Sequence, residues 1–360
     1  MRAALLVEYD SPLSVTSVPD PDLTPSGAVI RVDACGVCRS DWHVWKGDWR
    51  WRMNPALPHI LGHEVAGEVI AVGREVKNFR AGMKVTLPFH LSCGHCTWCE
   101  SGQSNLCDTY TAIGFSVPGG FAELINIPNA DESLFELPSG VSPLDAAALG
   151  CRVTSAFHGI VDKAHLAAGE TMIVFGCGGL GLAAVQIGVA LGARVVAVDR
   201  NQNALDRAAA EGALCLLAEG GSSRMAERAR DMTSGGADVT VDALGSVHTL
   251  TPALESLKKR GRHLQLGLTG VEEKGFLPTA LDSVVKRELA IVGSVGCPRE
   301  SFESLLALVE SGKLEPQRLI SRRVGLAGID NAFIEMSDYT SSGFSIVEPA
   351  RLLIVNAAPE

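Results

Sequence analysis

The stretch TMIVFGCGGLG, at residues 171–181, constrains the fold more than any other part of the sequence. A short apolar run leads into a glycine-rich turn, which is followed by the apolar segment 182–193 and by a second short run, RVVAVD, at 194–199. Short apolar runs bounded by glycine are typical of buried parallel strands. The charge-free length of 171–193 would also suit a membrane span. Its cluster of glycines instead favours a strand, a glycine loop, a helix and a second strand.

The spacing of the glycines indicates what this loop can bind. Gly176, Gly178 and Gly181 fit the pattern G-x-G-x-x-G. In this pattern the first glycine allows a tight turn, the second lets the backbone approach a pyrophosphate, and the third allows close helix packing. Gly179 and Leu180 belong to the same loop, and the helix expected after it, over 182–193, presents its free N–H groups to phosphate oxygens. The pattern therefore predicts a dinucleotide site formed by these five residues.

Asp199 ends the second strand and bears on the choice of dinucleotide. An acidic side chain at this place accepts hydrogen bonds from the ribose hydroxyls of NAD. It would repel the 2′-phosphate of NADP, because the two groups carry like charges. We therefore expect NAD as the cofactor. Arg200, the next residue, leaves the alternative open, since an arginine could bind that phosphate.

Strands and helices continue to alternate after this segment. Strands are expected over 237–245, 262–268 and 289–296, and helices over 248–261 and 300–313. This alternation predicts a doubly wound parallel sheet in a nucleotide-binding domain that covers residues 152–295. Gly267 and Leu268, at the end of a predicted strand, are expected to contact the cofactor.

Residues 1–151 have a different texture, with short apolar runs, frequent turns and poor helical periodicity. This texture predicts a β-rich, barrel-like domain. Three motifs of the chain each contain a residue that can bind zinc: CGVCRSDWH contains Cys38, GHEVAGEVIAVG contains His63, and LGCRVTSAFHG contains Cys151. Two thiolates and one imidazole leave the fourth position of a tetrahedral zinc open, which is the catalytic pattern.

Cys93, Cys96, Cys99 and Cys107 form a second group of thiols, within the stretch CGHCTWCESGQSNLC. A chain of 360 residues buries enough surface to fold without covalent staples. The apolar run in the N-terminal MRAALLVEYD is too short for a secretory signal. We therefore expect a cytoplasmic protein with reduced thiols, which favours a metal site over disulfides.

Taken together, these motifs resemble those of the zinc-dependent medium-chain alcohol dehydrogenases. The family's zinc signature, G-H-E-x2-G-x5-G, is matched by Gly62, His63, Glu64, Gly67 and Gly73. The resemblance covers nearly the whole chain and implies an α/β protein. A β-rich, GroES-like catalytic domain would be formed by residues 1–151 and 296–360, and a Rossmann NAD-binding domain by residues 152–295.

The resemblance also implies two zinc ions per subunit. The spacing Cys-x2-Cys-x2-Cys-x7-Cys is similar to the family's structural zinc lobe, in which four thiolates close the coordination sphere. A pair of disulfides and an iron–sulfur cluster are the alternatives for this loop. The catalytic zinc would be held by Cys38, His63 and Cys151.

Further roles near the catalytic zinc follow from the same resemblance. Ser40 would hold the proton of the alcohol, and His43 would pass it toward solvent through the cofactor ribose, since imidazole titrates near neutrality. The alternative for His43 is an exposed loop histidine. Asp41 would orient the ligand His63, and Glu64 would lie near the zinc as a transient ligand.

Other positions match cofactor and substrate contacts of the family. Arg39 falls where a residue pairs with the cofactor pyrophosphate, with a solvated side chain as the alternative. Ser155 falls where a hydroxyl packs against the nicotinamide, and Phe89 matches a position in the substrate pocket. Trp49 and Trp51 belong to a cluster of tryptophans that would either line the substrate cleft or cover the domain edge. These aromatic residues favour an apolar or aromatic alcohol.

Charge and composition exclude other classes of partner. The formal net charge is −10, without a basic patch or run, which argues against nucleic acid. The expected partners are a small alcohol and its aldehyde or ketone, and the family implies a homo-oligomer, with a tetramer favoured over a dimer. Alternatives on this scaffold are an enzyme for a polyol or an amino-alcohol, a zinc-free reductase and a non-catalytic binding protein. The intact zinc-binding residues argue against the last two.

Overall fold

The computed structural model describes residues 1–351, and the chain divides into two compact units. Unit 1 comprises Met1–Ser101, Leu106–Gly150 and the described residues from Ile320 to Arg351. Unit 2 comprises Gly102–Asn105 and Cys151–Leu319. The α/β class and the pairing of a β-rich unit with a parallel-sheet unit are confirmed.

Unit 1 is built mainly of antiparallel strands. Its N-terminal elements are β1 (Arg2–Leu6), β2 (Ser14–Ser17), β3 (Ala28–Val37), α1 (Arg39–Lys46), β4 (His59–Ile60), β5 (Glu64–Val72), β6 (Lys84–Thr86), β7 (His90–Leu91), α2 (Thr97–Glu100), β8 (Thr111–Ala112), β9 (Leu124–Ile127), α3 (Ala130–Ser133), β10 (Phe135–Glu136) and α4 (Pro143–Ala148). The C-terminal part adds β17 (Ile320–Val324), α12 (Ile329–Ser337) and β18 (Phe344–Val347).

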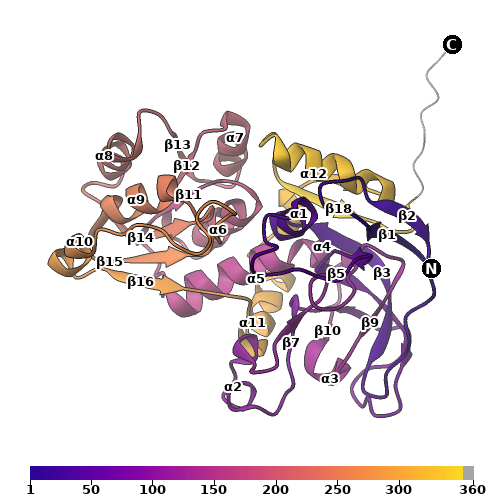
Figure 1. Ribbon diagram of the computed structural model, residues 1–360. Helices are drawn as coiled ribbons and strands as arrows, with labels where there is room; N and C mark the ends of the chain where they lie inside the picture. Colours follow the sequence, from indigo (N-terminus) through magenta and orange to yellow (C-terminus); the bar gives the residue numbers. More distant parts are fainter. Residues whose placement is uncertain (352–360) are drawn as a thin grey trace. The chain divides into compact units, whose positions relative to one another are not determined.

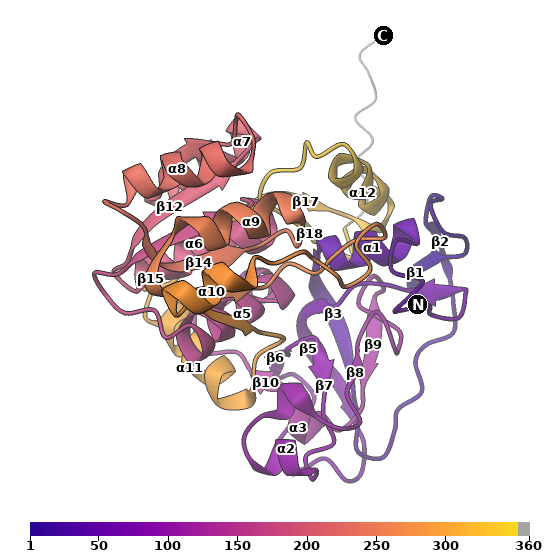
Figure 2. The same cartoon turned by 60° about the vertical axis from the view of Figure 1, so that its left-hand side comes forward.

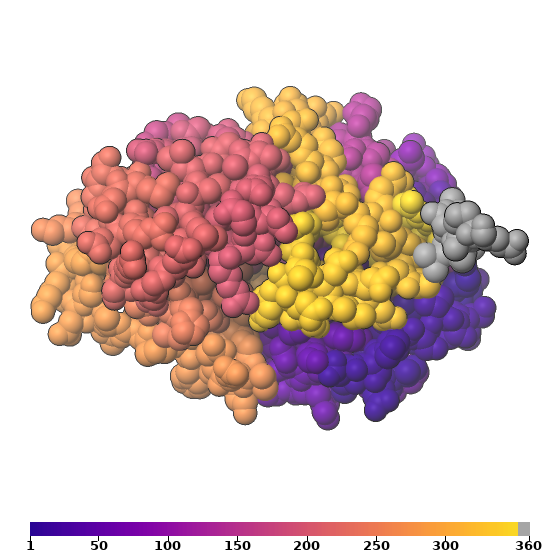
Figure 3. Space-filling model, turned by 90° about the horizontal axis from the view of Figure 1, so that it is seen from above, coloured from indigo at the N-terminus to yellow at the C-terminus, as the bar shows by residue number. Residues whose placement is uncertain are grey.

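The largest sheet of unit 1 joins the two ends of the described chain. Its strand order is β10-β6-β5-β3-β18-β17, with β9 also paired to β3. Strand β18 runs antiparallel to β3, with Ser345 opposite Val37 and Val347 opposite Cys35 (Figure 1). In the space-filling view the C-terminal part of unit 1, in yellow, lies against N-terminal residues of the same unit, in indigo (Figure 3). The end of β3, just before Cys38, is therefore held by strands on both sides.

Unit 2 contains a six-stranded, wholly parallel sheet with the order β13-β12-β11-β14-β15-β16. Its elements are α5 (Cys151–Phe157), a π-helical turn (His158–Lys163), β11 (Thr171–Phe175), α6 (Gly179–Ala190), β12 (Arg194–Asp199), α7 (Gln202–Ala210), β13 (Leu214–Leu217), α8 (Ser222–Met232), β14 (Ala237–Asp242), α9 (Val247–Ser256), β15 (Leu257–Gln265), α10 (Leu281–Arg287), β16 (Ala290–Gly293) and α11 (Arg299–Glu310).

Alternate side chains of β11 face opposite helix layers, because successive residues of a strand point to opposite faces. Ile173 and Phe175 pack in one core with Ala229 of α8 and Ala253 of α9. Met172 lies on the other face, against Gly188 of α6. The sheet of unit 2 is thus covered by helices on both faces, as the predicted doubly wound arrangement requires (Figure 2).

The domain boundary near residue 296 and the boundary between α9 and β15 differ most from those expected from the sequence. Residues 296–319 were expected in the catalytic domain, but they lie in unit 2. The reason is α11, where Phe302 is fully buried and the Ser301 hydroxyl donates to Asp162 Oδ2 at 2.5 Å. The helix expected over 248–261 ends at Ser256, and β15 begins five residues earlier than the expected strand, at Leu257.

The charge-free stretch 171–193 contains β11 and the twelve-residue helix α6. No helix among residues 1–351 is long and apolar enough to cross a membrane.

Candidate active site

Four side chains from three separate segments meet at the end of β3. Cys38 precedes α1, His63 directly precedes β5, Glu64 begins β5, and Cys151 begins α5. One candidate ligand atom from each of these residues lies within 4.8 Å of the others. Cys151 follows Gly150 directly, so a peptide bond joins it to unit 1. Thiolate, imidazole and carboxylate are the groups that bind zinc in proteins.

Asp41 organises this cluster from the first turn of α1. Its Oδ1 lies 2.8 Å from His63 Nδ1 and also accepts from the Gly62 N–H at 3.0 Å. Its Oδ2 accepts from the Cys38 N–H at 3.0 Å. Asp41 and His63 are both fully buried. The carboxylate therefore fixes the ring of His63 with Nδ1 as donor, which leaves Nε2 to face the cluster.

His63 Nε2 supplies the test of whether a metal fits these residues. It is buried and has no hydrogen-bond partner among residues 1–351. Buried polar atoms are rarely left unpaired, because the loss of water costs free energy. Burial lowers the pKa of His63, but the carboxylate of Asp41 and the thiol of Cys38 outweigh it and raise the pKa above its usual value. A metal ion bound by His63 Nε2, Cys38 and Cys151 would satisfy this nitrogen.

Two aromatic rings and a glycine pack against residues of the cluster. The ring centroid of Phe115 lies 4.6 Å from that of His63, and Phe89 meets the same ring edge-on at 5.8 Å. At Gly150, a Cβ atom would lie 2.3 Å from Cβ of Glu64. Only glycine can therefore occupy the position between Leu149 and Cys151 without moving Glu64.

His43 projects from α1 into a second group of side chains. Its Nδ1 lies 3.1 Å from Asp48 Oδ2, and its ring stacks on Trp49 with centroids 4.5 Å apart. Burial, and secondly the positive charge of Arg39, lower the pKa of His43 to about 4, against the opposing effect of Asp48. His43 is therefore neutral near pH 7, with Nδ1 as donor to the carboxylate. Ser40 lies half-buried in the first turn of the same helix.

Arg39 is held by residues of unit 1. Its guanidinium stacks on Trp42 at 3.7 Å and lies 5.0 Å from the ring centroid of Tyr339. It also donates to the Met336 carbonyl at 2.5 Å. Arg39 therefore packs against other residues of unit 1, which disfavours the alternative of a solvated side chain.

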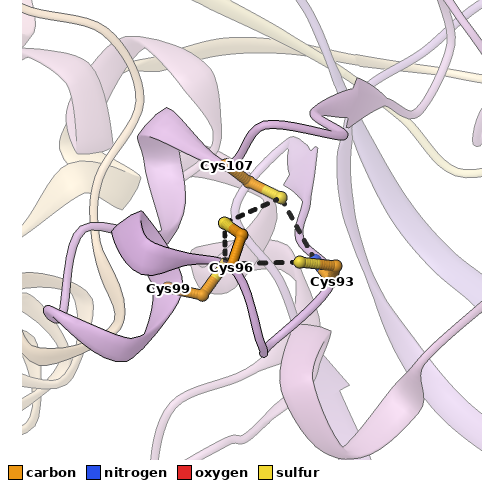
Figure 4. A group of neighbouring side chains, drawn as sticks. All are labelled: Cys93, Cys96, Cys99 and Cys107. Carbon is orange, nitrogen blue, oxygen red and sulfur yellow. Dashed lines mark hydrogen bonds between the residues drawn. The ribbon is translucent and has the colours of Figure 1, made fainter.

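Cys93, Cys96, Cys99 and Cys107 point toward one another around a common centre (Figure 4). The sulfur atoms of Cys96 and Cys99 lie 3.5 Å apart, and those of Cys96 and Cys107 lie 3.9 Å apart. These distances exceed a disulfide bond of about 2.05 Å, and all four cysteines are free. The geometry is therefore that of four separate sulfur ligands.

The protonation of these thiols also fits a metal site. A hydrogen bond from the His95 N–H lowers the pKa of Cys93 to about 6, whereas burial raises the pKa of Cys99 to about 12. The backbone thus favours a thiolate on one side of the group, while four thiolates so close together would repel each other. A cation at the centre resolves this conflict, and four sulfur ligands match tetrahedral zinc.

The glycine loop of unit 2 has the features expected of a phosphate-binding turn. Gly176 has a φ of +89°, in the left-handed region that favours glycine. At Gly181, a Cβ would lie 1.7 Å from the Gly176 carbonyl oxygen, so the helix can pack this closely only without a side chain. No atom lies within 4 Å of a Cβ built on Gly178, which leaves its backbone accessible. Helix α6 begins at Gly179, followed by Leu180.

Asp199 at the end of β12 is bound to the same loop. Its Oδ2 accepts from the Cys177 N–H at 2.6 Å, and its Oδ1 accepts from the Asn201 N–H at 2.8 Å. Arg200 follows it and is exposed. The carboxylate therefore stands beside the glycine loop, where a bound dinucleotide would meet it.

The remaining candidate residues have different surroundings. Ser155 is half-buried on α5, and Gly267 and Leu268 follow β15. Trp49 is buried, whereas Trp51 is exposed and has the guanidinium of Arg52 5.8 Å from its ring centroid. Asp48 and Phe115 belong to no sequence motif, and only the folded chain brings them to His43 and His63.

Known proteins resemble this chain in both sequence and fold. Residues 24–139 match the alcohol dehydrogenase GroES-like domain, and residues 179–311 match the zinc-binding dehydrogenase domain. The chain is 30% identical to an NAD-dependent alcohol dehydrogenase of Sulfurisphaera tokodaii, over 97% of this chain and 100% of the relative. It is 31% identical to an L-threonine 3-dehydrogenase of Yersinia enterocolitica, over 93% of this chain and 96% of the relative. The solved alcohol dehydrogenase of Thermus sp. ATN1 superimposes with a TM-score of 0.86 at 30% identity, over 97% and 99% of the two chains.

Proposed function

The chain belongs to the zinc-type medium-chain dehydrogenase/reductase family, and we propose that it transfers hydride reversibly between a primary or secondary alcohol and NAD. The product is an aldehyde or a ketone. The observation that carries this proposal is the cluster of Cys38, His63, Glu64 and Cys151, with its ligand atoms within 4.8 Å of one another. A relative that is 30% identical over 97% of this chain is an NAD-dependent alcohol dehydrogenase.

We propose two zinc ions per subunit. Cys38, His63 and Cys151 hold the catalytic ion, with Glu64 beside it, and the four cysteines of Figure 4 hold a structural ion. When bound, the catalytic zinc acts as a Lewis acid that lowers the pKa of the alcohol, and NAD accepts the hydride. Asp41 supports this chemistry by holding His63 Nδ1 as a donor.

The proton released from the alcohol needs a path through the protein. In our proposal Ser40 Oγ accepts this proton as it releases its own hydroxyl proton, which His43 takes onward at Nε2. The choice of nitrogen follows from Asp48, which engages Nδ1 at 3.1 Å. Because its pKa is lowered to about 4, the ring is neutral near pH 7 and holds the proton only in transit. As it does so, the carboxylate of Asp48 stabilises the resulting imidazolium.

Cofactor binding is proposed for the carboxyl edge of the parallel sheet. The loop Gly176–Gly181 binds the pyrophosphate, and Asp199 accepts from the adenosine ribose and disfavours the 2′-phosphate of NADP. The remaining proposed contacts are Arg39, Ser155, Arg200, Gly267 and Leu268.

An apolar or aromatic alcohol is the proposed substrate class. Phe89 packs on His63 and Trp49 packs on His43, so buried rings flank both the metal cluster and the proton path. Trp51 is proposed at the outer end of this aromatic wall. The second candidate is an amino-alcohol, because one relative at 31% identity is an L-threonine 3-dehydrogenase.

A homo-oligomer, preferably a tetramer, is also proposed. Strand β16 ends the six-stranded sheet, with Ile291 46% exposed, and an open strand edge can pair with another chain. Leu281 and Val285 lie in α10, directly before β16 in the sequence, and expose 66% and 76% of their surface. Light scattering after size-exclusion chromatography measures the subunit number directly.

The initial rate of NADH formation tests the proposed reaction. Zinc-loaded protein is mixed with NAD and a panel of short primary, secondary, benzylic and polyol alcohols, with L-threonine included. A strong rate with benzylic or apolar alcohols supports the proposal, and a strong rate with L-threonine supports the second candidate. Cys38→Ser serves as the control, since it should abolish turnover while NADH still binds. Turnover in this variant would contradict the metal assignment.

A further inference from the structure

Thr240, His263 and the half-buried Gln265 form a line of hydrogen bonds inside unit 2 that plays no part in the proposed chemistry. Thr240 Oγ1 lies 3.0 Å from His263 Nδ1, and His263 Nε2 lies 3.1 Å from Gln265 Oε1. Gln265 Nε2 then donates to the Gly267 carbonyl at 2.8 Å. Thr240 and His263 are fully buried. Polar groups buried in this way must satisfy one another, because water does not reach them.

The last bond of the line fixes the direction of the others. Because Gln265 Nε2 donates to Gly267, its Oε1 is left to accept from His263 Nε2–H. Burial lowers the pKa of His263, so the ring is neutral and its Nδ1 accepts from the Thr240 hydroxyl. Every donor therefore points the same way, from Thr240 toward Gly267. Such aligned hydrogen bonds strengthen one another in a buried setting.

The backbone around Gly267 is held closely against the loop after β14. The Asp242 carbonyl accepts from the Gly267 N–H at 2.8 Å, and Asp242 Oδ1 accepts from the Gly245 N–H at 2.9 Å. At Gly267, a Cβ would lie 2.3 Å from the carbonyl carbon of Leu244. The N–H side of Gly267 is thus fixed by Asp242. Its carbonyl side is fixed by Gln265.

The topology of the sheet places this loop relative to the other cofactor residues. Asp199 follows β12 and the glycine loop follows β11, while β14 and then β15 lie on the other side of β11. The strands are parallel, so all these loops leave the same edge of the sheet. A dinucleotide whose ribose meets Asp199 and whose pyrophosphate meets the glycine loop extends toward β14 and β15. Gly267 and Leu268 therefore lie on the nicotinamide side of the pyrophosphate.

We propose that Thr240, His263 and Gln265 are positioning residues that hold the Gly267–Leu268 loop for the nicotinamide half of NAD. This inference rests on the proposed function, since it takes NAD as the cofactor. The three residues act through the loop and do not touch the reacting atoms. Gln265 has the largest effect, because it alone bonds to the loop itself.

Calorimetric titration of the zinc-loaded protein with NAD and with ADP-ribose tests this proposal. ADP-ribose keeps the adenosine, the pyrophosphate and the second ribose, but lacks nicotinamide. Gln265→Met removes both hydrogen bonds of the side chain at similar volume, and Gln265→Glu keeps the acceptor for His263 while removing the donor to Gly267. In both variants we expect about fivefold to tenfold weaker NAD binding, the usual net worth of one hydrogen bond, with ADP-ribose binding unchanged. Thr240→Val should have a smaller effect, since it leaves the bond to Gly267 in place.

The two ligands separate this proposal from its rivals. A loss of NAD affinity that ADP-ribose shares, or no loss with either ligand, would overturn the positioning role. Thermal unfolding of each variant shows whether a shared loss comes from a damaged fold. If the unaltered protein bound neither ligand, the proposed cofactor itself would be wrong, and the positioning role would fall with it.

Discussion

The carboxylate of Asp41 and the imidazole of His63 form a hydrogen bond of 2.8 Å between two fully buried side chains. The same carboxylate binds the backbone N–H groups of Cys38 and Gly62. One side chain thus links the segment before α1 to the segment before β5. It holds two of the proposed zinc ligands in place before any metal arrives, which reduces the ordering that metal binding requires.

Replacing Asp41 with Asn should weaken zinc binding at this cluster. An amide cannot supply the charge that keeps His63 Nδ1 a donor, and loss of such outer partners typically costs 10–100-fold in metal affinity or activity. We expect about one zinc per chain to be lost on dialysis, measured by elemental analysis, with turnover reduced in parallel. Asp33→Asn, at an exposed ion pair with Arg31, is the matched control. Unchanged zinc content in Asp41→Asn would contradict the role of this carboxylate.

Replacing Cys96 with Ser should remove only the second zinc. Its sulfur lies 3.5 Å from Cys99 and 3.9 Å from Cys107, so one missing ligand opens a site that needs four. We expect a lower unfolding temperature, because structural zinc contributes folding free energy, while the zinc at Cys38 stays. Cys215→Ser changes a thiol outside both clusters and should leave zinc content unaltered. Equal zinc in both variants would rule out a metal at the four cysteines.

Much of this architecture could be predicted from the sequence, because it depends on local patterns. The apolar runs at 171–175 and 194–199 are β11 and β12, and the helix expected over 182–193 is α6, which begins at Gly179 and ends at Ala190. Cys38, His63 and Cys151 lie in three short motifs, and the fold brings them together.

Other features depend on packing that no local pattern reveals. Phe115, in the turn after β8, packs on His63, and Thr240 of β14 bonds to His263 of β15. The switch from helix to strand at Leu257 has a related cause. The helical pattern of the sequence continues to 261, but Leu257 pairs with Ala237 of β14, and sheet pairing between distant residues overrides local propensity.

Stability should depend on His43 below pH 6.5. The pKa of His43 is lowered to about 4 from an ordinary value of 6.5, so the unfolded chain binds more protons between these values. The stabilising contribution is therefore complete above about pH 6.5 and is lost as the pH falls toward 4, by up to roughly 3 kcal/mol. Urea unfolding at pH 7.5 and at pH 4.5 measures this change against His43→Gln, which cannot titrate. A stability difference between the two proteins that did not change with pH would contradict the lowered pKa.

Replacing Asp199 with Gly should have two effects: it should shift cofactor preference toward NADP, and it should loosen the glycine loop. The charge that repels a 2′-phosphate is removed, and so is the acceptor for the Cys177 N–H at 2.6 Å. We expect kcat/KM for NADP relative to NAD to rise by about tenfold or more, while NAD affinity falls. Asp206→Asn, on the exposed side of α7 with a bond to Gln202, should change neither value. A constant ratio in Asp199→Gly would mean that this carboxylate does not read the ribose.

Replacing Gly150 with Ala should disturb the catalytic cluster without touching a ligand. The new Cβ would lie 2.3 Å from both Cβ and Cγ of Glu64, closer than two carbon atoms can approach, so either Glu64 or the chain before Cys151 must move. Displacements of this kind cost about 1–3 kcal/mol of stability, and a shift of about 1 Å in a catalytic group can cost on the order of 100-fold in rate. Zinc content and turnover measure the two effects separately. Gly293→Ala adds a Cβ with no atom within 4 Å and serves as the control. Gly293→Ala should keep wild-type zinc content and turnover. If Gly150→Ala kept them too, the close packing of Gly150 on Glu64 would have no part in forming the metal site.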